Sequence, residues 1–293
     1  MRVFVTGASG HIGSALVTEL VQAGHEVVGL ARSDNSAATV KALGAEVHRG
    51  DSADLAGLRT AAADSDAVIH LAFDHEVMRT DFAGAANADL AVARSFGEAL
   101  AGTGKTFIGI GIKHTGIEAV DAAIDANPRS VVAREIETFA DRGIRSMLVA
   151  VPPVTHSSND KHGFIPTLIG IARETGVSAY VDEGANRWPA AHTLDVAHLF
   201  RLALEQAPAG AQLFAATENG ITVREIAETI GRHLGIPAKS ITADEAAEHF
   251  ATFPFITMNI PMDNTGTREL LDWRPEHPGL IADLDEGHYF AAK

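Results

Sequence analysis

The chain has 293 residues, of which 46% are hydrophobic and 6% aromatic, and its formal net charge is −15, from 38 acidic and 23 basic residues. Its length suits one large α/β domain, or a nucleotide-binding domain with a smaller companion. The acidity argues against nucleic acid or an anionic membrane as a partner, because both bind clustered Lys and Arg, and the lack of cysteine excludes disulfides, thiolate catalysis and cysteine zinc sites. Met1 leads directly into the first predicted strand and no apolar run approaches the ~18 residues of a membrane span, so we expect a cytoplasmic protein.

Apolar, β-rich runs alternate with helical periodicity over the first half of the chain. The predicted strands are Arg2–Thr6, Glu26–Ala31, Glu46–His48, Ala67–Leu71, Lys105–Ile112 and Ile144–Val151. The predicted helices between them are His11–Ala23, Ala37–Leu43, Asp54–Ala63, Gly84–Leu100 and Arg129–Asp141. Continuous apolar strands are typical of burial on both faces, so the alternation predicts an α/β fold whose parallel sheet is covered by helices on both sides.

The pattern changes after Val151, where Pro152-Pro153 and a polar loop follow. The later predicted elements are a helix at Ile165–Glu174, a strand at Ser178–Val181, a helix at His192–Glu205, a strand at Gln212–Ala216, and helices opened by capping boxes at Thr222 and Thr242. We therefore divide the chain into 1–153 and 154–293, with about 178–181 and 192–216 packing back on the main sheet.

The segment Thr6–Gly13 carries three glycines between a predicted strand and a predicted helix. Gly7 allows a tight turn, Gly10 lets the backbone approach a pyrophosphate, and Gly13 lets the helix pack closely on the sheet. The free N–H groups at the start of that helix then face the phosphates. An ordinary strand-to-helix turn has similar glycines, but the position inside a βαβ unit predicts a dinucleotide-binding loop. The residues expected to contact the cofactor here are Gly7, Ser9, Gly10, His11, Ile12 and Gly13.

The end of the second strand indicates which dinucleotide binds. An acidic residue about 20 positions after the glycines would accept hydrogen bonds from the adenosine ribose. This chain has Arg32-Ser33 there, and a guanidinium with a neighbouring hydroxyl suits a 2′-phosphate. The alternative is an ordinary surface arginine beside Asp34. We expect NADP(H) in preference to NAD(H).

Two further segments are expected to line the cofactor. Asp51 and Ser52, after the third strand, would flank the adenine, although Asp51 is equally suited to cap the helix that starts near Asp54. The other segment closes the fourth strand and comprises Leu71, Ala72 and Phe73.

Together these features resemble the extended short-chain dehydrogenase/reductase superfamily over nearly the whole chain. The matching segments are Thr6–Gly13, Gly50-Asp51, His70–Ala72, Val151–Pro153 and Trp188–Val196, the last with His192 and Asp195. The resemblance implies a Rossmann-type, doubly wound parallel sheet at 1–153 that binds NAD(P), and a smaller C-terminal domain, mainly 154–293, that binds a small-molecule substrate. It also implies a homodimer through the helices that follow the fourth and fifth strands.

The catalytic residues usual in that superfamily are missing here. They are a Ser or Thr after the fifth strand and a Tyr-x-x-x-Lys pair on the next helix. The Tyr and Lys positions fall near Asn127 and Val131, and Phe107–Ile112 offers no hydroxyl. Asn127 is better explained as a helix N-cap with Pro128 at the first helical position. The chain therefore resembles the atypical branch of the superfamily.

Two other patterns are interpreted as coincidental. Tyr289 and Lys293 have the Tyr-x-x-x-Lys spacing, but they lie at the chain terminus, so we expect Tyr289 to pack on the C-terminal helix. The loop residues His156, Asp160 and His162 lack tight ligand spacing, so no metal site is expected.

A substitute proton donor has to lie at the carboxyl ends of the strands, where open α/β sheets bind ligands. Lys113 and His114, directly after the fifth strand, are the first candidates, and histidine titrates near neutral pH. The candidate substrate residues are Asp74, His75, His156, Phe164, Trp188 and His192. Each has an alternative, because loop histidines are usually solvated, Asp74 suits a cap, and the aromatic rings suit the core of the smaller domain.

We therefore predict an NADPH-dependent oxidoreductase that transfers hydride to a small or medium, apolar carbonyl compound or conjugated alkene. The cofactor carries the hydride chemistry, which can survive the loss of an acid typically worth about 10²–10⁴-fold in rate. The proton would come from His114, Lys113, water or the substrate itself. The alternatives are a catalytically silent NADP(H)-binding sensor and a non-redox isomerase or lyase on the same fold.

Overall fold

The computed structural model describes residues 1–114, 118–251, 253–260 and 262–291. The chain forms two compact units. The first comprises Met1–Ala150, Ala197–Leu213 and Gly266–Trp273, and the second comprises Val151–Val196, Phe214–Thr265 and Arg274–Lys293. Among the described residues, no helix combines the length and the apolar character that crossing a bilayer requires.

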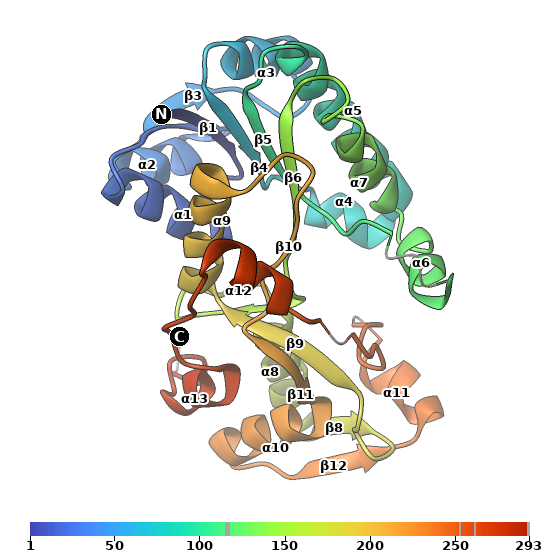
Figure 1. Ribbon diagram of the computed structural model, residues 1–293. Coiled ribbons are helices and arrows are strands. Elements are labelled where there is room, and N and C mark those ends of the chain that lie inside the picture. Colours follow the sequence, from blue (N-terminus) through green and yellow to red (C-terminus); the bar gives the residue numbers. More distant parts are fainter. Residues whose placement is uncertain (115–117, 252, 261, 292–293) are drawn as a thin grey trace. The chain divides into compact units, whose positions relative to one another are not determined.

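A seven-stranded sheet forms the centre of the first unit, in the order β10-β6-β5-β4-β1-β2-β3 (Figure 1). Its strands are β1 (Arg2–Thr6), β2 (Glu26–Ala31), β3 (Glu46–Arg49), β4 (Ala67–His70), β5 (Thr106–Ile110), β6 (Arg145–Ala150) and β10 (Gln212–Phe214). The ladders that join β1 to β6 are all parallel, and Val3 lies opposite Val27 on one side and Ala67 on the other. The predicted Rossmann-type sheet is confirmed, and its strand order reverses between β1 and β4, where such sheets bind ligands.

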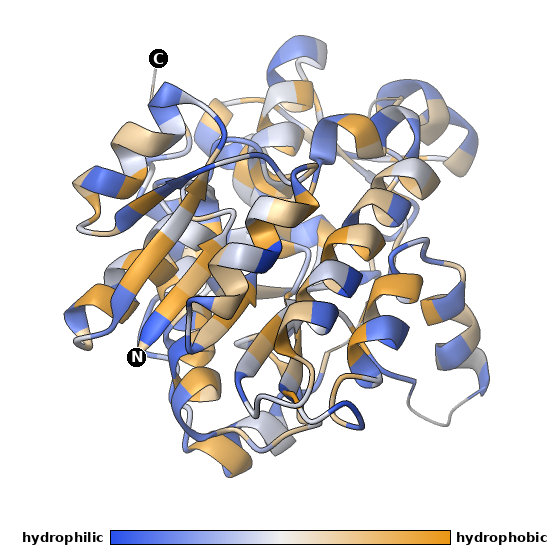
Figure 2. Ribbon diagram, turned by 90° about the horizontal axis from the view of Figure 1, so that it is seen from above, coloured by the Kyte–Doolittle hydropathy of each residue, from blue (hydrophilic) through white to orange (hydrophobic). Residues whose placement is uncertain are grey.

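Helices cover both faces of this sheet (Figure 1). On one face lie α1 (His11–Gln22), α2 (Asp34–Ala42) and the part of α9 (Thr193–Gln206) from Ala197 onward, and on the other lie α3 (Leu55–Ala63), α5 (Phe82–Leu100) and α7 (Ser130–Glu137). Shorter helices are α4 (His75–Thr80), α6 (Glu118–Asp125) and α12 (Thr265–Leu271). The strands are mainly hydrophobic whereas the helices carry both hydrophobic and hydrophilic residues (Figure 2), as expected when only one helix face is buried. Phe96 of α5 lies in the core, with its ring 6.2 Å from Phe4 and 5.9 Å from Phe107.

The second unit has two small sheets. One has the order β11-β9-β7, from β7 (Val154–His156), β9 (Arg187–His192) and β11 (Glu218–Thr222), and the other pairs β8 (Ser178–Val181) with β12 (Ala238–Ile241). Its helices are α8 (Phe164–Thr175), α10 (Val223–Leu234), α11 (Ala243–His249) and α13 (Leu280–Asp285). These elements enclose one hydrophobic core in which Ile165, Trp188, Ile226 and Leu280 are fully buried.

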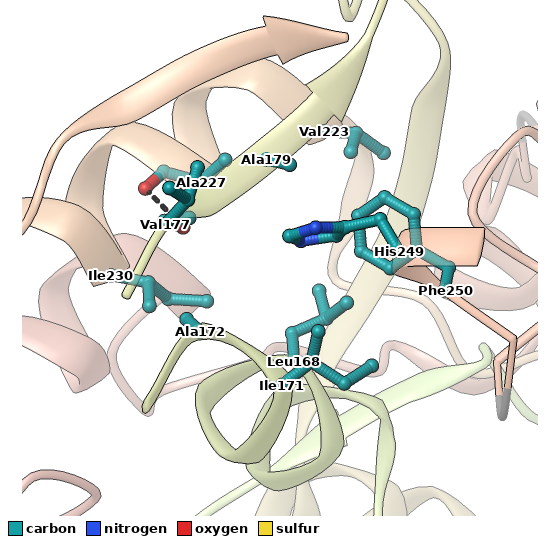
Figure 3. A pocket seen from close by; sticks show the side chains of 11 residues that line it. Leu168, Ile171, Ala172, Val177, Ala179, Val223, Ala227, Ile230, His249 and Phe250 are labelled. Carbon is teal, nitrogen blue, oxygen red and sulfur yellow. Dashed lines mark hydrogen bonds between the residues drawn. The ribbon is translucent and has the colours of Figure 1, made fainter. Parts of the chain in front are cut away.

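This core holds a small cavity of about 10 Å³ between α8, β8, α10 and α11 (Figure 3). The imidazole of His249 points into it, beside Phe250. Nε2 of His249 is buried and has no partner within the described part of the chain, and burial lowers the pKa of this side chain. Such a volume holds about one water molecule, so the cavity is a packing defect and not a ligand pocket.

One predicted segment belongs to another sheet. Ala197–Leu213 lies in the first unit, whereas β8, which was also expected on the main sheet, pairs in parallel with β12 in the second unit, with Ser178 opposite Ala238. The expectation for 178–181 is therefore wrong. A sequence reveals β character, but the strand that completes its backbone hydrogen bonds can come from 60 residues away.

The segment before α7 also differs from its prediction. The helix begins at Ser130, two residues after the expected Pro128. Oδ1 of Asn127 accepts a hydrogen bond from the N–H of Arg129 at 2.9 Å, so Asn127 closes a turn ahead of the helix and does not cap it. The short helices α4, α6, α12 and α13 and the strands β7, β9, β11 and β12 were not predicted.

Candidate functional site

The loop between β1 and α1 has the conformation that its glycines predict. Gly7 has a φ of +71°, and a Cβ there would lie 2.8 Å from the backbone N of Ala72. A Cβ on Gly13 would lie 2.0 Å from the carbonyl oxygen of Gly7. Gly10 is the N-cap of α1 and offers no side-chain cap to the first N–H groups of the helix. This backbone cradle fits the pyrophosphate of a dinucleotide. The other predicted contacts on the loop and first turn, all partly exposed, are Ser9, His11 and Ile12.

The corner after β2 places two arginines together. Arg32 is exposed directly after β2, and Arg49, the last residue of β3, lies opposite the preceding Ala31. The Arg49 guanidinium donates to the carbonyl oxygen of Ser33 at 2.7 Å and to Oδ1 of Asp34 at 2.8 Å. Asp34 therefore pairs with Arg49, and no ion pair of Arg32 occurs in the described ranges. Sequence reasoning missed Arg49, whose only signal was its position at the end of a parallel strand.

The hydroxyl of Ser33 has a structural partner at this corner. It accepts a hydrogen bond from the N–H of Ser36 at 3.2 Å, as the N-cap of α2 in a complete capping box. If the Ser33 hydroxyl also contacts the 2′-phosphate of a cofactor, it would do so while capping α2.

The other predicted cofactor segments lie at the same edge of the sheet. Oδ1 of Asp51 accepts a hydrogen bond from the N–H of Ala53 at 2.8 Å, and the N-cap of α3 is Asp54. The cap alternative for Asp51 is therefore wrong, and Asp51 and Ser52 are exposed in a turn. After β4, the chain contacts the glycine loop at Leu71 and Ala72, and it continues to a partly exposed Phe73.

A buried chain of polar side chains runs from β1 to the segment before α7. Oγ1 of Thr6 accepts a hydrogen bond from the N–H of Ala72 at 3.2 Å and lies 2.6 Å from Nδ1 of His70. Nε2 of His70 donates to Oδ1 of Asp89 at 2.8 Å, because a carboxylate only accepts. Oδ2 of Asp89 accepts from Nε and Nη2 of Arg129, at 3.2 and 2.9 Å.

The carboxylate of Asp89 is the centre of this network. The side chains of Asp89 and His70 are only 3% and 4% exposed. Burial alone would raise the pKa of Asp89, but the hydrogen bond and charge of His70 and the charge of Arg129 hold it below its usual value. Sequence reasoning missed Asp89, although an available signal was a carboxylate on the apolar stripe of α5, one turn from Ala85 and Ala93.

The two candidate proton donors have other partners. Nζ of Lys113 donates to the carbonyl oxygen of Gly210 at 2.6 Å, and its N–H donates to Oε1 of Gln212 at 2.8 Å, which ties the end of β5 to the β10 segment. Nε2 of His114 lies 2.9 Å from Oδ1 of Asp125, and both side chains are about half exposed.

The next two candidates lie at the start of α4. Oδ1 of Asp74 accepts hydrogen bonds from the N–H groups of Glu76 and Val77, so Asp74 is the N-cap of this helix. The His75 ring lies edge-on to Phe73 at 5.2 Å. Desolvation, followed by the positive charges of Arg129 and Arg79, lowers the pKa of His75.

In the second unit, His156 and His192 belong to one histidine cluster. Nδ1 of His156 lies 2.8 Å from Oδ2 of Asp283, and His156 is fully buried. The His192 ring stands edge-on to His156 at 5.4 Å and stacks on His277 at 4.7 Å. Desolvation, followed by the charges of His156 and His277, lowers the pKa of His192 to about 4, against attraction from Asp283 and Asp195. His156 exposes no surface that a ligand could touch.

The aromatic candidates of the second unit form part of its core. Trp188 is fully buried, and its Nε1 donates to the carbonyl oxygen of Met258 at 3.0 Å. Phe164 lies 5.4 Å from the Trp188 ring and stacks on Phe255 at 5.6 Å. Trp188 therefore has the core role, and only the partly buried Phe164 retains surface for a ligand.

The terminal Tyr289 anchors a loop of the second unit. Its hydroxyl accepts from the N–H of Ser157 at 3.1 Å and donates to Oδ2 of Asp160 at 3.2 Å, and burial beside that carboxylate raises its pKa. Lys293 lies outside the described residues. Asp160 also accepts from the N–H of Gly163, so it organises the loop.

A different set of residues could hold a metal ion. Asp283, Glu286 and His288 each offer one potential ligand atom, and these three atoms lie within 4.8 Å of one another.

Residues 3–104 match the NAD dependent epimerase/dehydratase family. The chain is 39% identical over 298 residues to an uncharacterized protein of Schizosaccharomyces pombe, covering 99% of this chain and 100% of the relative. It is 28% identical over 254 residues to the 4-hydroxy-2-methyl-3-oxo-4-farnesyl-3,4-dihydroquinoline-1-oxide ketoreductase of Stigmatella aurantiaca, covering 82% of this chain and 75% of that protein. Its structure is similar to UDP-glucuronic acid 4-epimerase from Bacillus cereus in complex with UDP-glucuronic acid and NAD, with a TM-score of 0.75, 17% identity, and coverage of 99% and 98% of the two chains.

We expect Gly13→Ala to weaken the binding of a nicotinamide dinucleotide, whether NADH or NADPH, because the new Cβ would lie 2.0 Å from the Gly7 carbonyl oxygen and push α1 off the loop. Overpacking costs about 1–3 kcal/mol, or about 5- to 150-fold in affinity if the cost falls on the bound loop. A nicotinamide fluorescence titration measures the change. The control is Gly266→Ala in α12, where a Cβ meets no atom within 4 Å. Equal affinities for the two variants would contradict the close-packing role of Gly13.

We expect the free energy of unfolding to fall as the pH falls from 6.5 toward 4, partly because of His192. The folded pKa is about 4 against an ordinary 6.5, so in this range the unfolded chain binds a proton that the folded chain excludes. The full difference corresponds to about 3 kcal/mol. Urea denaturation at several pH values should show a shallower dependence for His192→Gln than for the control His162→Gln, which changes an exposed loop residue. Identical slopes for both variants would show that His192 does not contribute.

Proposed function

Because this chain belongs to the NAD-dependent epimerase/dehydratase family of extended short-chain dehydrogenases/reductases, we propose that it is an NADPH-dependent oxidoreductase. The observation that carries the proposal is the intact backbone cradle, in which Gly7 and Gly13 leave no room for a Cβ. A bound nicotinamide would supply the hydride chemistry. The chain's own residues would bind the pyrophosphate on α1 and orient the rest along Leu71, Ala72 and Phe73.

The preference for NADP(H) rests on Arg32. No acidic residue follows β2 directly to accept bonds from the ribose, and Arg32 is exposed at that position. The alternative for Arg32 was an ordinary surface arginine beside Asp34; the Asp34 carboxylate itself accepts a hydrogen bond from Arg49. An exposed guanidinium without a carboxylate partner among the described residues suits a 2′-phosphate.

We propose a small or medium, apolar carbonyl compound or conjugated alkene as the acceptor. An activated acceptor needs little help from an acid, which suits a site without the usual Tyr and Lys. The ketoreductase among the relatives supports a carbonyl substrate. We propose that water supplies the proton, because Lys113 binds the Gly210 carbonyl and His114 pairs with Asp125.

We also propose that the protein is a homodimer through α5, which lies between β4 and β5, and α7, which lies between β5 and β6. Light scattering during gel filtration would then give a mass twice the 30.8 kDa of one chain. A mass of one chain would contradict the dimer and leave the cofactor proposal intact.

The decisive experiment is a fluorescence titration of the purified chain with NADPH and, separately, NADH, followed by assays of NADPH oxidation with activated carbonyls and enones. Preferential NADPH binding with turnover would support the oxidoreductase. Preferential binding without turnover of any acceptor would favour the sensor alternative. Failure to bind either nucleotide would overturn the proposal.

We expect Arg32→Ala to lower the affinity for NADPH about tenfold to a hundredfold and to leave the affinity for NADH nearly unchanged, because only NADPH carries the 2′-phosphate. Parallel titrations of both nucleotides test this selectivity. The matched control is Arg59→Ala, which removes an exposed arginine of α3 that pairs with Glu98. If Arg32→Ala lowered the affinities for NADPH and NADH equally, Arg32 would not be the residue that binds the 2′-phosphate.

We expect His114→Asn to keep kcat within about threefold of the parent, because a solvent proton donor does not depend on this side chain. The measurement is kcat against pH for both proteins with one activated acceptor. A loss of 10²-fold or more, together with a changed pH profile of kcat, would instead identify His114 as the acid.

A further inference from the structure

Arg129 lies at the carboxyl edge of the main sheet with part of its guanidinium unbound. Nε and Nη2 donate to Asp89, and the guanidinium carbon lies 4.1 Å from the centre of the Phe73 ring. Its side chain is 23% exposed. Nη1 donates no hydrogen bond to any described residue. A cation held on two sides and open on a third is suited to bind an oxygen atom of a ligand.

The position of Arg129 is close to the glycine loop. The backbone N of Ala72 would be 2.8 Å from a Cβ on Gly7, and the next residue is Phe73, whose ring Arg129 covers. The guanidinium therefore lies beside the strand end along which the proposed cofactor would extend. This is the edge, next to the reversal of strand order, where open α/β sheets bind their ligands.

The buried side chains behind Arg129 hold it in place. Oδ2 of Asp89 accepts two hydrogen bonds from Arg129, and Oδ1 accepts one from His70 at 2.8 Å. Thr6 lies 2.6 Å from the other ring nitrogen of His70. We treat Asp89, His70 and Thr6 as positioning residues, because their side chains form one hydrogen-bonded chain that ends at the Arg129 guanidinium. A buried carboxylate needs a cation and hydrogen bonds, so the network restricts the guanidinium to a narrow range of positions.

We infer that Arg129 binds the acceptor oxygen that becomes negative during reduction, as the substitute for the missing Tyr-Lys pair. The inference rests on the proposed oxidoreductase function. The acceptor takes a hydride from the reduced nicotinamide, which is oxidised, and a C–H bond forms at the electrophilic carbon. The π electrons move to the oxygen, giving an alkoxide or, from a conjugated alkene, an enolate. Arg129 stabilises this charge by a hydrogen bond.

The proton comes from a different source. A guanidinium is not deprotonated in proteins, so Arg129 stabilises the oxyanion without protonating it. Water then protonates the alkoxide oxygen, or the α carbon of the enolate, and the hydroxide left behind is neutralised by the solvent. This division of roles explains how a site can work when no acid replaces the tyrosine.

The test uses the full chain, NADPH, and the probes 2-cyclohexen-1-one and 9,10-phenanthrenequinone as acceptors. Arg129→Gln should lower kcat about 10²–10³-fold, the usual cost of losing one oxyanion donor. The fluorescence-titrated affinity for NADPH should stay within about twofold. The matched control is Arg224→Gln, which removes an exposed arginine that pairs with Glu228 on α10 and should leave kcat unchanged.

Two further variants separate chemistry from folding. Arg129→Lys keeps the charge and should restore part of kcat. Arg129→Ala should regain activity when dilute guanidinium chloride is added, and not with sodium chloride, because the added cation can occupy the vacated position. A side chain that only supports the fold would show neither effect.

Each outcome decides one of the two proposals. If the parent oxidises NADPH with a probe and Arg129→Gln matches Arg224→Gln, the inference fails while the oxidoreductase stands. Loss of NADPH binding by Arg129→Gln, without rescue by lysine or guanidinium, would assign Arg129 to the cofactor or the fold and would also overturn the inference. If the parent chain oxidises NADPH with neither probe, the inference is overturned. If it also turns over none of the activated carbonyls and enones, the proposed oxidoreductase function is overturned as well.

Discussion

The buried carboxylate of Asp89 is the constraint around which the carboxyl edge of the sheet is organised. A charge that is 3% exposed persists only if cations and hydrogen bonds replace the water it has lost. His70 and Arg129 provide them, and Thr6 completes the chain. In this way one side chain of α5 fixes the ends of β1 and β4 and the segment ahead of α7.

The same region shows how a dinucleotide-binding fold can be kept while its usual catalytic residues are lost. The glycine loop depends on backbone geometry, since Gly7 and Gly13 each lie too close to a neighbouring backbone atom for any side chain. The catalytic pair of the superfamily depends instead on two side chains, which can be replaced without disturbing that backbone. Arg129 belongs to the segment in which the pair would lie, and it brings a permanent charge where the usual acid would titrate.

In the second unit, residues that the sequence suggested as ligand contacts have structural roles instead. Several of its polar residues look like ligands in a linear reading, yet they form the interior of the fold. His156 binds Asp283, Tyr289 bridges Ser157 and Asp160, and Trp188 is fully buried. These hydrogen bonds join segments that are more than 100 residues apart, such as Ser157 and Tyr289. The loop after β7 is therefore held in place by residues near the end of the chain.

The sequence by itself determined the Rossmann-type sheet, the glycine loop and the absence of the Tyr-Lys pair. These features depend on short-range patterns: strands with continuous apolar runs, glycines at fixed spacing, and residue types at one position. The tertiary structure alone decided which strand β8 joins, which carboxylate Arg49 binds, and that Asp89 and Arg129 meet across 40 residues. Pairing of that kind depends on which side chains the completed fold brings within hydrogen-bonding distance, and no local pattern contains that information.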